Sequence, residues 1–224
     1  MVSKLSRRII WTSISKLMAF NESYFDASTV VGIMPWLNKT AAGLAADLMM
    51  SRAGADLVLV CVQDDLRAGP MHIWNTVISK TNQPFIVYCA EDAFAGRYWL
   101  RFGLETLKAP GAGLLAFNDG KWFGQLAAFG LVRRSWLDPI YGGLLFHPGY
   151  AQHFGDTELT LIARQQGALV YNPNAVLIEV DHYKDQREVN VADQSLFNER
   201  SATGFGKRIN NPQLNGIFTT NPSA

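Results

Sequence analysis

The sequence predicts an α/β protein with a mostly parallel central sheet and helices on both of its faces. Three features indicate this class: continuous apolar runs of strand length, helix-like segments between the runs, and polar residues directly after them. The runs are TVVGIMPW (29–36), DLVLVCV (56–62), FIVYCA (85–90) and GLLAF (113–117). Strands that are apolar along their whole length belong to sheets that are buried on both faces, and such sheets are typically parallel.

Helix signals separate these runs. Residues 40–55, TAAGLAADLMMSRAGA, are rich in helix formers, with apolar residues every three or four positions and Gly54 where a helix stop is expected. Two more helices are expected over about 71–80 and 97–108. Strands that alternate with helices in this way favour a parallel sheet built from strand-helix-strand units.

The second half of the chain is less regular. We expect a strand followed by a helix over 121–137, a loop rich in glycine and aromatic residues over 141–155, a helix over 156–167, and one or two final strands over 168–182. From about Asn190 the composition turns polar, and residues 201–224 are predicted to be a polar tail, weakly packed from Arg208 onward.

Composition and charge favour an ordinary globular protein. The chain has 224 residues, 48% of them hydrophobic, and a formal net charge of +1. It can bury one core of its own, and its overall charge does not attract nucleic acid or membrane. Arg7–Arg8 and Arg133–Arg134 form local basic pairs.

The sequence also allows a prediction of where in the cell the protein is located. Lys16 interrupts an apolar segment that would otherwise resemble a signal peptide, and no apolar run reaches the length of a membrane span. Cys61 and Cys89 lie inside apolar runs without metal-type spacing, which predicts two buried thiols in a reducing compartment. A cytoplasmic location is the prediction.

Two acidic pairs follow predicted strands. Asp64–Asp65 comes after the second run and Glu91–Asp92 after the third. Because ligands of open parallel sheets bind beyond the carboxyl ends of the strands, both pairs are expected to face one crevice. Like charges packed together raise one another's pKa and cost stability unless a cation lies between them. The sequence therefore predicts a divalent metal that itself holds an anionic substrate.

The ordered motifs of the chain are similar to those of a known family. Pro35-Trp36-Leu37-Asn38 matches a turn after the first strand, Gln63-Asp64-Asp65 the acids after the second, and Ala90-Glu91-Asp92, with Trp99 downstream, a metal-binding Asp-x-Asp signature. The family also has an acidic motif at the start of a helix, followed by a final strand that ends in His. The chain matches these features through Asp156, Glu158, Leu159, Arg164, Gly167, Pro173 and His182. Over about 29–182 the chain thus resembles glycosyltransferases of the A fold, closest to the family 2 type.

The resemblance implies a Rossmann-like, mostly parallel sheet and a hexosyltransferase-like activity. A sugar would pass from a nucleotide diphosphate donor, with a UDP-sugar favoured, to an acceptor hydroxyl. Asp92 and His182 would hold Mn²⁺ or Mg²⁺, and Asp156 would act as the general base of an inverting reaction. The donor-binding candidates are Pro35, Trp36, Asn38, Asp64, Asp65 and Glu91.

The resemblance also divides the chain. Residues 1–200 form a single transferase domain, in which about 29–120 bind the nucleotide and about 121–200 carry the catalytic and acceptor functions. Two positions depart from the family pattern, because Ala90 replaces the first acid of the metal signature and Gly155 replaces the acid that often precedes the base. Ala90 favours a different interpretation, a non-catalytic nucleotide-sugar or glycan-binding module.

The sequence is compatible with further enzyme classes and acceptors. A retaining transferase of the same fold is one such enzyme class. A sugar nucleotidyltransferase is disfavoured, because it needs a Gly-rich, Arg-containing loop after the first strand, and IMPWLNKTAAG lacks that loop. The compact chain also resembles small bacteriophage transferases, some of which decorate modified DNA bases. A DNA acceptor would require a basic groove, for which the candidates are Arg7, Arg8, Arg133, Arg134 and Lys207. Saccharide, lipid-linked sugar and protein acceptors are equally compatible with the sequence.

Overall fold

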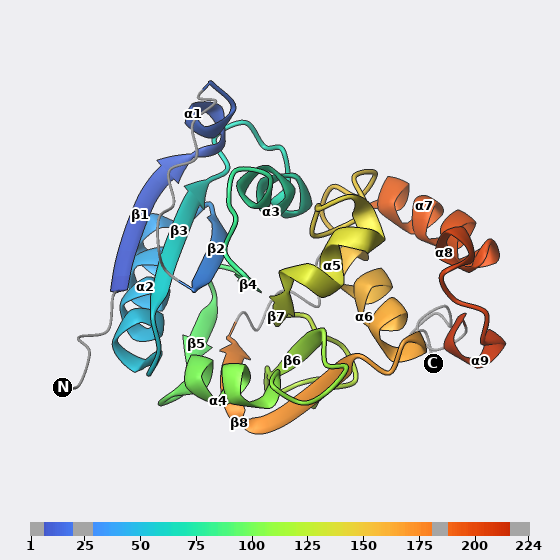
Figure 1. Cartoon of the computed structure of the whole chain (residues 1–224). Coiled ribbons are helices and arrows are strands. Elements are labelled where there is room, and N and C mark those ends of the chain that lie inside the picture. Colours follow the sequence, from blue (N-terminus) through green and yellow to red (C-terminus); the bar gives the residue numbers. More distant parts are fainter. Residues whose placement is uncertain (1–6, 20–28, 181–187, 216–224) are drawn as a thin grey trace.

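A computed structural model describes residues 7–19, 29–180 and 188–215, and one eight-stranded sheet organises it (Figure 1). The strand order is β1-β3-β2-β4-β7-β6-β8-β5. All strands run parallel except β7 and β5, each antiparallel to the strands beside it. The strands are β1 (Arg7–Ser13), β2 (Val30–Trp36), β3 (Leu57–Gln63), β4 (Phe85–Tyr88), β5 (Ala93–Ala95), β6 (Leu114–Asn118), β7 (Gly130–Arg133) and β8 (Leu169–Glu179).

Helices cover both faces of the sheet, which gives two separate apolar cores. One face packs against α2 (Lys39–Arg52) and α4 (Trp99–Thr106). The other packs against α1 (Ile14–Ala19), α3 (Pro70–Ile78), α5 (Arg134–Tyr141), α6 (Gly155–Gln165), α7 (Val191–Ala202) and α8 (Gly204–Lys207), and the short α9 (Pro212–Asn215) lies beside α6. The predicted mostly parallel α/β class is therefore confirmed.

The elements predicted over 29–182 are present, and two strands were missed. Residues 168–182 give one strand, β8, and residues 121–137 give β7 followed by α5. β1 was missed because RRIIWTS is an edge strand whose residues are mostly exposed or half-buried, so its sequence lacks the apolar run of the central strands. β5 has only three residues, Ala93–Ala95, and exists through its pairing with β8.

The middle of the sheet brings three strand ends together. In the β2–β3 pair Trp36 is opposite Gln63, and in the β2–β4 pair Ile33 is opposite Tyr88. The segments that follow these strands therefore emerge at one edge. They carry the turn at Leu37 and Asn38, Asp64, and the Glu91–Asp92 pair.

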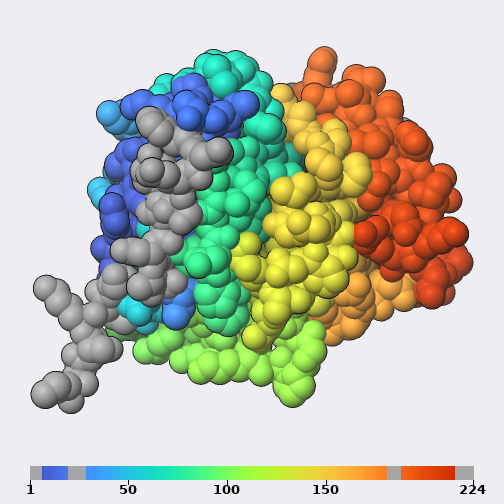
Figure 2. All heavy atoms as spheres, turned by 45° about the horizontal axis from the view of Figure 1, so that its top comes forward, coloured from blue at the N-terminus to red at the C-terminus, as the bar shows by residue number. Residues whose placement is uncertain are grey.

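The C-terminal segment differs from the prediction. Residues 201–224 were expected to form a polar tail, weakly packed from Arg208 onward, but Phe205 is fully buried and Ile209 is 3% exposed. Both belong to the core that contains α6, and Phe205 lies 5.3 Å from the Phe197 ring of α7. In Figure 2 the orange-to-red C-terminal helices form one continuous body with the yellow and orange segments before them. The prediction failed because a few large apolar residues, spaced among polar ones, are enough to dock this segment.

A buried ion pair fixes α7 to α6. Glu158 is fully buried, and its carboxylate accepts hydrogen bonds from Arg200 Nε at 2.7 Å and Nη2 at 2.6 Å. The hydroxyls of Tyr141 and Tyr150 donate to the same carboxylate at 2.5 and 2.8 Å. Burial, and then the charge of Glu158, raise the pKa of Tyr141, so its hydroxyl stays a donor. A carboxylate taken out of water needs such a complete set of partners.

The structure also bears on the predictions for the two cysteines and for membrane-spanning segments. Cys61 and Cys89 are free and buried, as predicted, and burial raises the pKa of Cys61 to about 12. Within the described residues, no helix has both the length and the apolar character needed to cross a membrane.

We expect the Arg200→Met substitution to lower the free energy of unfolding by about 3 kcal/mol, because it leaves the buried Glu158 charge without its cation. Urea denaturation measures the change. Arg101→Met is the matched control, since Arg101 pairs with Glu105 at 3.7 Å on the exposed face of α4 and its loss should cost less than about 1 kcal/mol. Equal losses in the two variants would contradict the role given to Glu158 and Arg200.

Candidate active site

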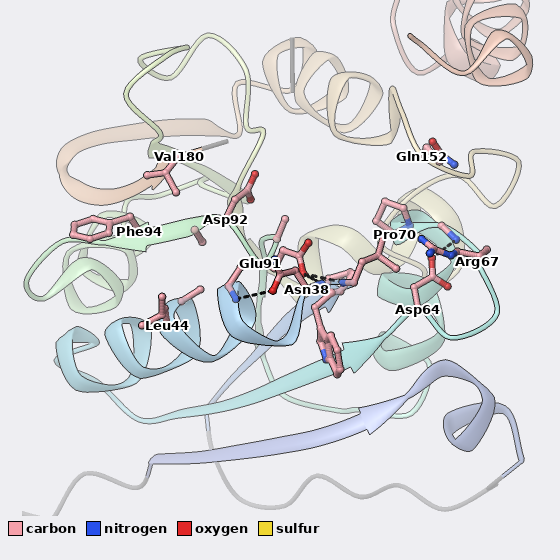
Figure 3. Close-up of a pocket in the computed structure, with 18 of the residues that line it drawn as sticks. Asn38, Leu44, Asp64, Arg67, Pro70, Glu91, Asp92, Phe94, Gln152 and Val180 are labelled. Carbon is pink, nitrogen blue, oxygen red and sulfur yellow. Dashed lines mark hydrogen bonds between the residues drawn. The ribbon is translucent and has the colours of Figure 1, made fainter. Parts of the chain in front are cut away.

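A cavity of about 990 Å³ lies at the edge where β2, β3 and β4 end (Figure 3). It has two chemically different ends. Asp64, Arg67, Pro70 and Gln152 lie at one end, and Leu44, Phe94 and Val180 at the other. Glu91 and Asp92 lie between them. Of the site residues that the sequence predicted, the cavity is lined by Pro35, Trp36, Asn38, Asp64, Glu91 and Asp92, together with Ala90 of the metal signature.

Glu91 shapes the turn that follows β2. Its Oε2 accepts hydrogen bonds from the backbone N–H groups of Leu37 at 2.8 Å and Asn38 at 2.7 Å. Asn38 in turn caps α2, since its Oδ1 accepts from the N–H groups of Thr40 and Ala41. One Glu91 oxygen thus holds the turn at the start of α2, which makes Asp92 the better candidate of the pair for a metal ligand.

Asp64 has a comparable role on the next strand. Its two carboxylate oxygens accept from the N–H groups of Ala68 at 2.7 Å and Gly69 at 3.0 Å, and so fold the loop that leads into α3. Its own N–H donates to the carbonyl of Trp36 at 3.0 Å, which joins the ends of β3 and β2. Asp64 is 9% exposed and still lines the cavity.

Asp65 lies elsewhere. It is not among the residues that line the cavity, and its carboxylate accepts from both the N–H and the hydroxyl of Ser15 in α1. The Ser15 hydroxyl lowers the pKa of Asp65. Because side chains of adjacent residues diverge at a strand end, only one acid of this pair reaches the cavity, and the sequence alone could not tell which.

Asp92 follows Glu91 and is half-buried. Its carbonyl accepts from the N–H of Val180 at 3.1 Å, which ties it to the end of β8. Within the part of the chain that the structure describes, no three His, Cys, Asp or Glu side chains are grouped closely enough to hold a metal. Mg²⁺ at nucleotide sites uses one or two carboxylates and completes its shell with substrate phosphates and water. Asp92 fits that arrangement; His182, the other predicted ligand, lies outside the described residues.

Asp156 is the second residue of α6, and its Oδ1 accepts from the N–H of Thr157 at 2.9 Å. It is not among the cavity-lining residues. Burial, and then the charge of Asp156, raise the pKa of Tyr88, the last residue of β4. The charge of Asp156 thus reaches the Tyr88 hydroxyl, which donates to the carbonyl of Ala127 at 2.6 Å.

Sequence reasoning assigned no role to four residues with polar side chains that line the cavity: Arg67, Gln152, His153 and Glu188. Arg67 has a positive φ of 54°, which is uncommon for a residue other than glycine and often marks a functional site. The loop with Gln152 and His153 is fixed from α7, since Asp193, 2% exposed, accepts from the N–H groups of Ala151, Gln152 and His153 at 2.7–2.9 Å. No local pattern reveals the positions of Gln152 and His153, because a distant helix fixes their loop.

Comparison with known proteins places this geometry in a known fold. The chain superposes on glucosyl-3-phosphoglycerate synthase from Mycobacterium tuberculosis, solved with Mn²⁺, UDP-glucose and phosphoglyceric acid, with a TM-score of 0.55 at 12% identity, covering 87% of this chain and 88% of that one. It superposes on the mannosyltransferase PcManGT from Pyrobaculum calidifontis, solved with GDP-Man and Mn²⁺, with a TM-score of 0.52 at 14% identity. The chain has the glycosyltransferase A fold.

The extent of these matches differs. The chain aligns over 84% of its own length with the mannosyltransferase but spans only 66% of that protein, just under two thirds. No protein-family model matches the sequence, and no curated protein matches it significantly. The similarity therefore lies in the arrangement of strands and helices, as the ordered motifs of the sequence indicated.

The adjacent acids Asp64 and Asp65 provide a test of the site geometry. Asp64→Ala should lower the free energy of unfolding by about 2 kcal/mol, because two backbone N–H groups in a poorly hydrated loop lose a charged acceptor. Asp65→Ala should have a smaller effect, since its bonds to Ser15 are exposed to water. Thermal and urea unfolding of the two variants measure the difference, and a larger loss for Asp65→Ala would refute this assignment.

Proposed function

We propose that the chain is a glycosyltransferase that uses a nucleotide diphosphate sugar. One observation carries the proposal: in an A-fold sheet, the turn after β2, Asp64 and the Glu91–Asp92 pair converge on a single cavity. Proteins of the same fold have been solved with UDP-glucose or GDP-Man and Mn²⁺, which supports the same ligand class here. We keep a UDP-sugar as the first donor to test and GDP-mannose as the second.

The end of the cavity at Asp64 suits the nucleoside. Pro35 and Trp36 at the end of β2 and Asn38 in the turn after it supply one wall. The Asp64 carboxylate keeps lone pairs for a base or ribose hydroxyl besides those that accept from the N–H groups of Ala68 and Gly69. Arg67 adds a cation at the same end. Glu91 would act on the donor through the turn that it holds.

Asp92 is the residue proposed to hold Mn²⁺ or Mg²⁺ together with the donor diphosphate. When bound, the cation neutralises the charge that develops on the leaving diphosphate. Because the described residues contain no cluster of three acids, histidines or cysteines that could hold a metal, the cation is expected to bind with the nucleotide and weakly without it. His182 is retained as a proposed ligand on the strength of the sequence resemblance.

Asp156 is the proposed general base. It would accept the proton of the acceptor hydroxyl while the hydroxyl oxygen bonds to the anomeric carbon and the nucleotide diphosphate leaves, with inversion at that carbon. The match of Asp156, Glu158 and Leu159 to the acidic motif of the resembled family supports this role. A retaining outcome is the second candidate, and the anomeric configuration of the product, measured by proton NMR, separates the two.

Two other interpretations are a non-catalytic binding module and a transferase that acts on DNA. A non-catalytic binding module is favoured by Ala90, which replaces the first acid of the metal signature. A DNA acceptor is not favoured, because three of the arginines considered for a basic groove bond to backbone carbonyls: Arg7 to Met50, Arg133 to Ala112 and Arg134 to Gln83. They stabilise the fold rather than assemble one basic surface.

The role of Asp92 can be tested by thermal unfolding with UDP or GDP, each with and without Mn²⁺. A nucleotide at a hundred times its dissociation constant should stabilise the wild type by about 2.7 kcal/mol, and Mn²⁺ alone should have little effect. Asp92→Asn should remove the metal-dependent part of the shift. Asp47→Asn, an exposed acid of α2 outside the cavity, is the control. Stabilisation by neither nucleotide in the wild type would argue against the proposed function.

The base assignment requires a different readout. Asp156→Asn should retain the nucleotide-dependent thermal shift and reduce the rate of sugar transfer about 10²- to 10⁴-fold, the usual contribution of a general base. Without a known acceptor, slow hydrolysis of the donor sugar by water can be followed instead, by release of UDP. Unchanged turnover in this variant would show that another group takes the proton or that no base is used.

A further inference from the structure

Helix α2 has two apolar faces, and only one of them packs into the core. Its core face consists of Ala42, Ala45, Ala46, Met49 and Met50, all buried. A second stripe, at the helical spacing i, i+3, i+4, i+7, lines the cavity and shares Ala45 with the core face: Ala41, Leu44, Ala45 and Leu48. A helix that is apolar on two sides normally has a partner on both.

The opposite wall of this part of the cavity is also apolar. Phe94 of β5 and Val180 after β8 face the cavity, and they are 41% and 43% exposed. Phe94 sits opposite Ile178 in the β5–β8 pair, and the guanidinium carbon of Arg52 lies 5.2 Å from its ring centroid. Arg52 also donates to the carbonyl of Ala95 at 2.7 Å, so the wall is fixed to α2.

The stripe and this wall form an apolar groove, defined by Ala41, Leu44, Ala45, Leu48, Phe94 and Val180. Leu44 is 65% exposed, and Leu37, which lies in the turn after β2 and also lines the cavity, is 54% exposed. A concentration of exposed large apolar side chains in one hollow marks a binding site. None of the six side chains can hydrogen-bond, so the hydroxyls of a saccharide would lose water there without gaining partners.

We propose that this groove binds the alkyl chain of the acceptor, so that the substrate is a hydroxyl compound with an acyclic hydrocarbon tail. The inference rests on the proposed function and specifies its acceptor class. Aliphatic side chains form most of the wall, which suits an alkyl chain better than a flat ring that would stack on aromatic residues. From Ala41 to Leu48 the helix is about 10 Å long, enough for a chain of several methylene groups.

The position of the groove is consistent with this role. Asp64 and Arg67 occupy the far end of the same cavity, and Asp92 lies between the two ends (Figure 3). Asp92 is joined to the groove through the hydrogen bond from Val180 N–H to its carbonyl. A donor that enters from the Asp64 end with its diphosphate at Asp92 therefore leaves the apolar end for the second substrate.

The experiment uses a homologous series of n-alkyl β-D-glucosides, from ethyl to octyl and below their micelle-forming concentrations. Isothermal titration calorimetry is performed on the full chain with saturating UDP and Mn²⁺. Each methylene buried in the groove should tighten binding roughly fourfold until the chain outgrows the groove. Leu44→Gln, on an exposed helical position, should flatten this dependence on chain length without changing the unfolding temperature.

Leu66→Gln is the matched control, because Leu66 is also exposed, at 54%, but does not line the cavity, and it should leave the chain-length dependence intact. UDP binding by the wild type with less than a twofold affinity gain from ethyl to octyl would overturn the inference and leave the proposed function standing. Alkyl glucosides that compete with UDP would also overturn it, since the two ends of the cavity would not be independent. A wild-type dimer that Leu44→Gln dissociates, seen by sedimentation, would show instead that the groove is a self-association surface.

Discussion

The candidate site depends on carboxylates that accept backbone N–H groups at the carboxyl edge of the sheet. Glu91 holds the turn after β2, and Asp64 holds the loop before α3, each through two hydrogen bonds. Charged acceptors make stronger bonds than neutral ones and cost much more when they are lost. These two acids thereby give the cavity its shape. From the sequence motif alone, their side chains would be expected to bind the ligand rather than the backbone.

This division of labour explains how several acids can share one edge. A carboxylate that accepts two N–H groups has much of its charge balanced locally, so Glu91 and Asp64 do not simply add to the repulsion around Asp92. The Asp65 side chain does not line the cavity, and it accepts a hydrogen bond from the N–H of Ser15 instead. The site then relies on few ligand-directed acids, which is compatible with a metal that arrives with its diphosphate and with Ala90 in place of an acid.

The C-terminal helices complete the site from a distance. Asp193 of α7 fixes the loop that carries Gln152 and His153, while Arg200 of the same helix pairs with the buried Glu158 of α6. The two contacts bind α7 on either side of Asp156, to the loop before it and to Glu158 after it. Loosening this helix would therefore alter the surroundings of the proposed base and the cavity wall together.

The sequence by itself determined the class of the fold, the order of the main strands and helices, and the edge where the site lies. The apolar run DLVLVCV and the spacing of apolar residues over 40–55 are local properties of the chain. Such local patterns indicate which faces of a strand or helix are buried. What only the tertiary structure decided was the direction of each polar side chain: Asp64 into the cavity and Asp65 away from it, Glu91 onto the turn, and the second apolar stripe of α2 into a groove. It also decided the docking of Phe205 and Ile209, which the polar composition around them concealed. These outcomes depend on partners far away in the chain, such as β5, β8 and α7, and no window of neighbouring residues contains them.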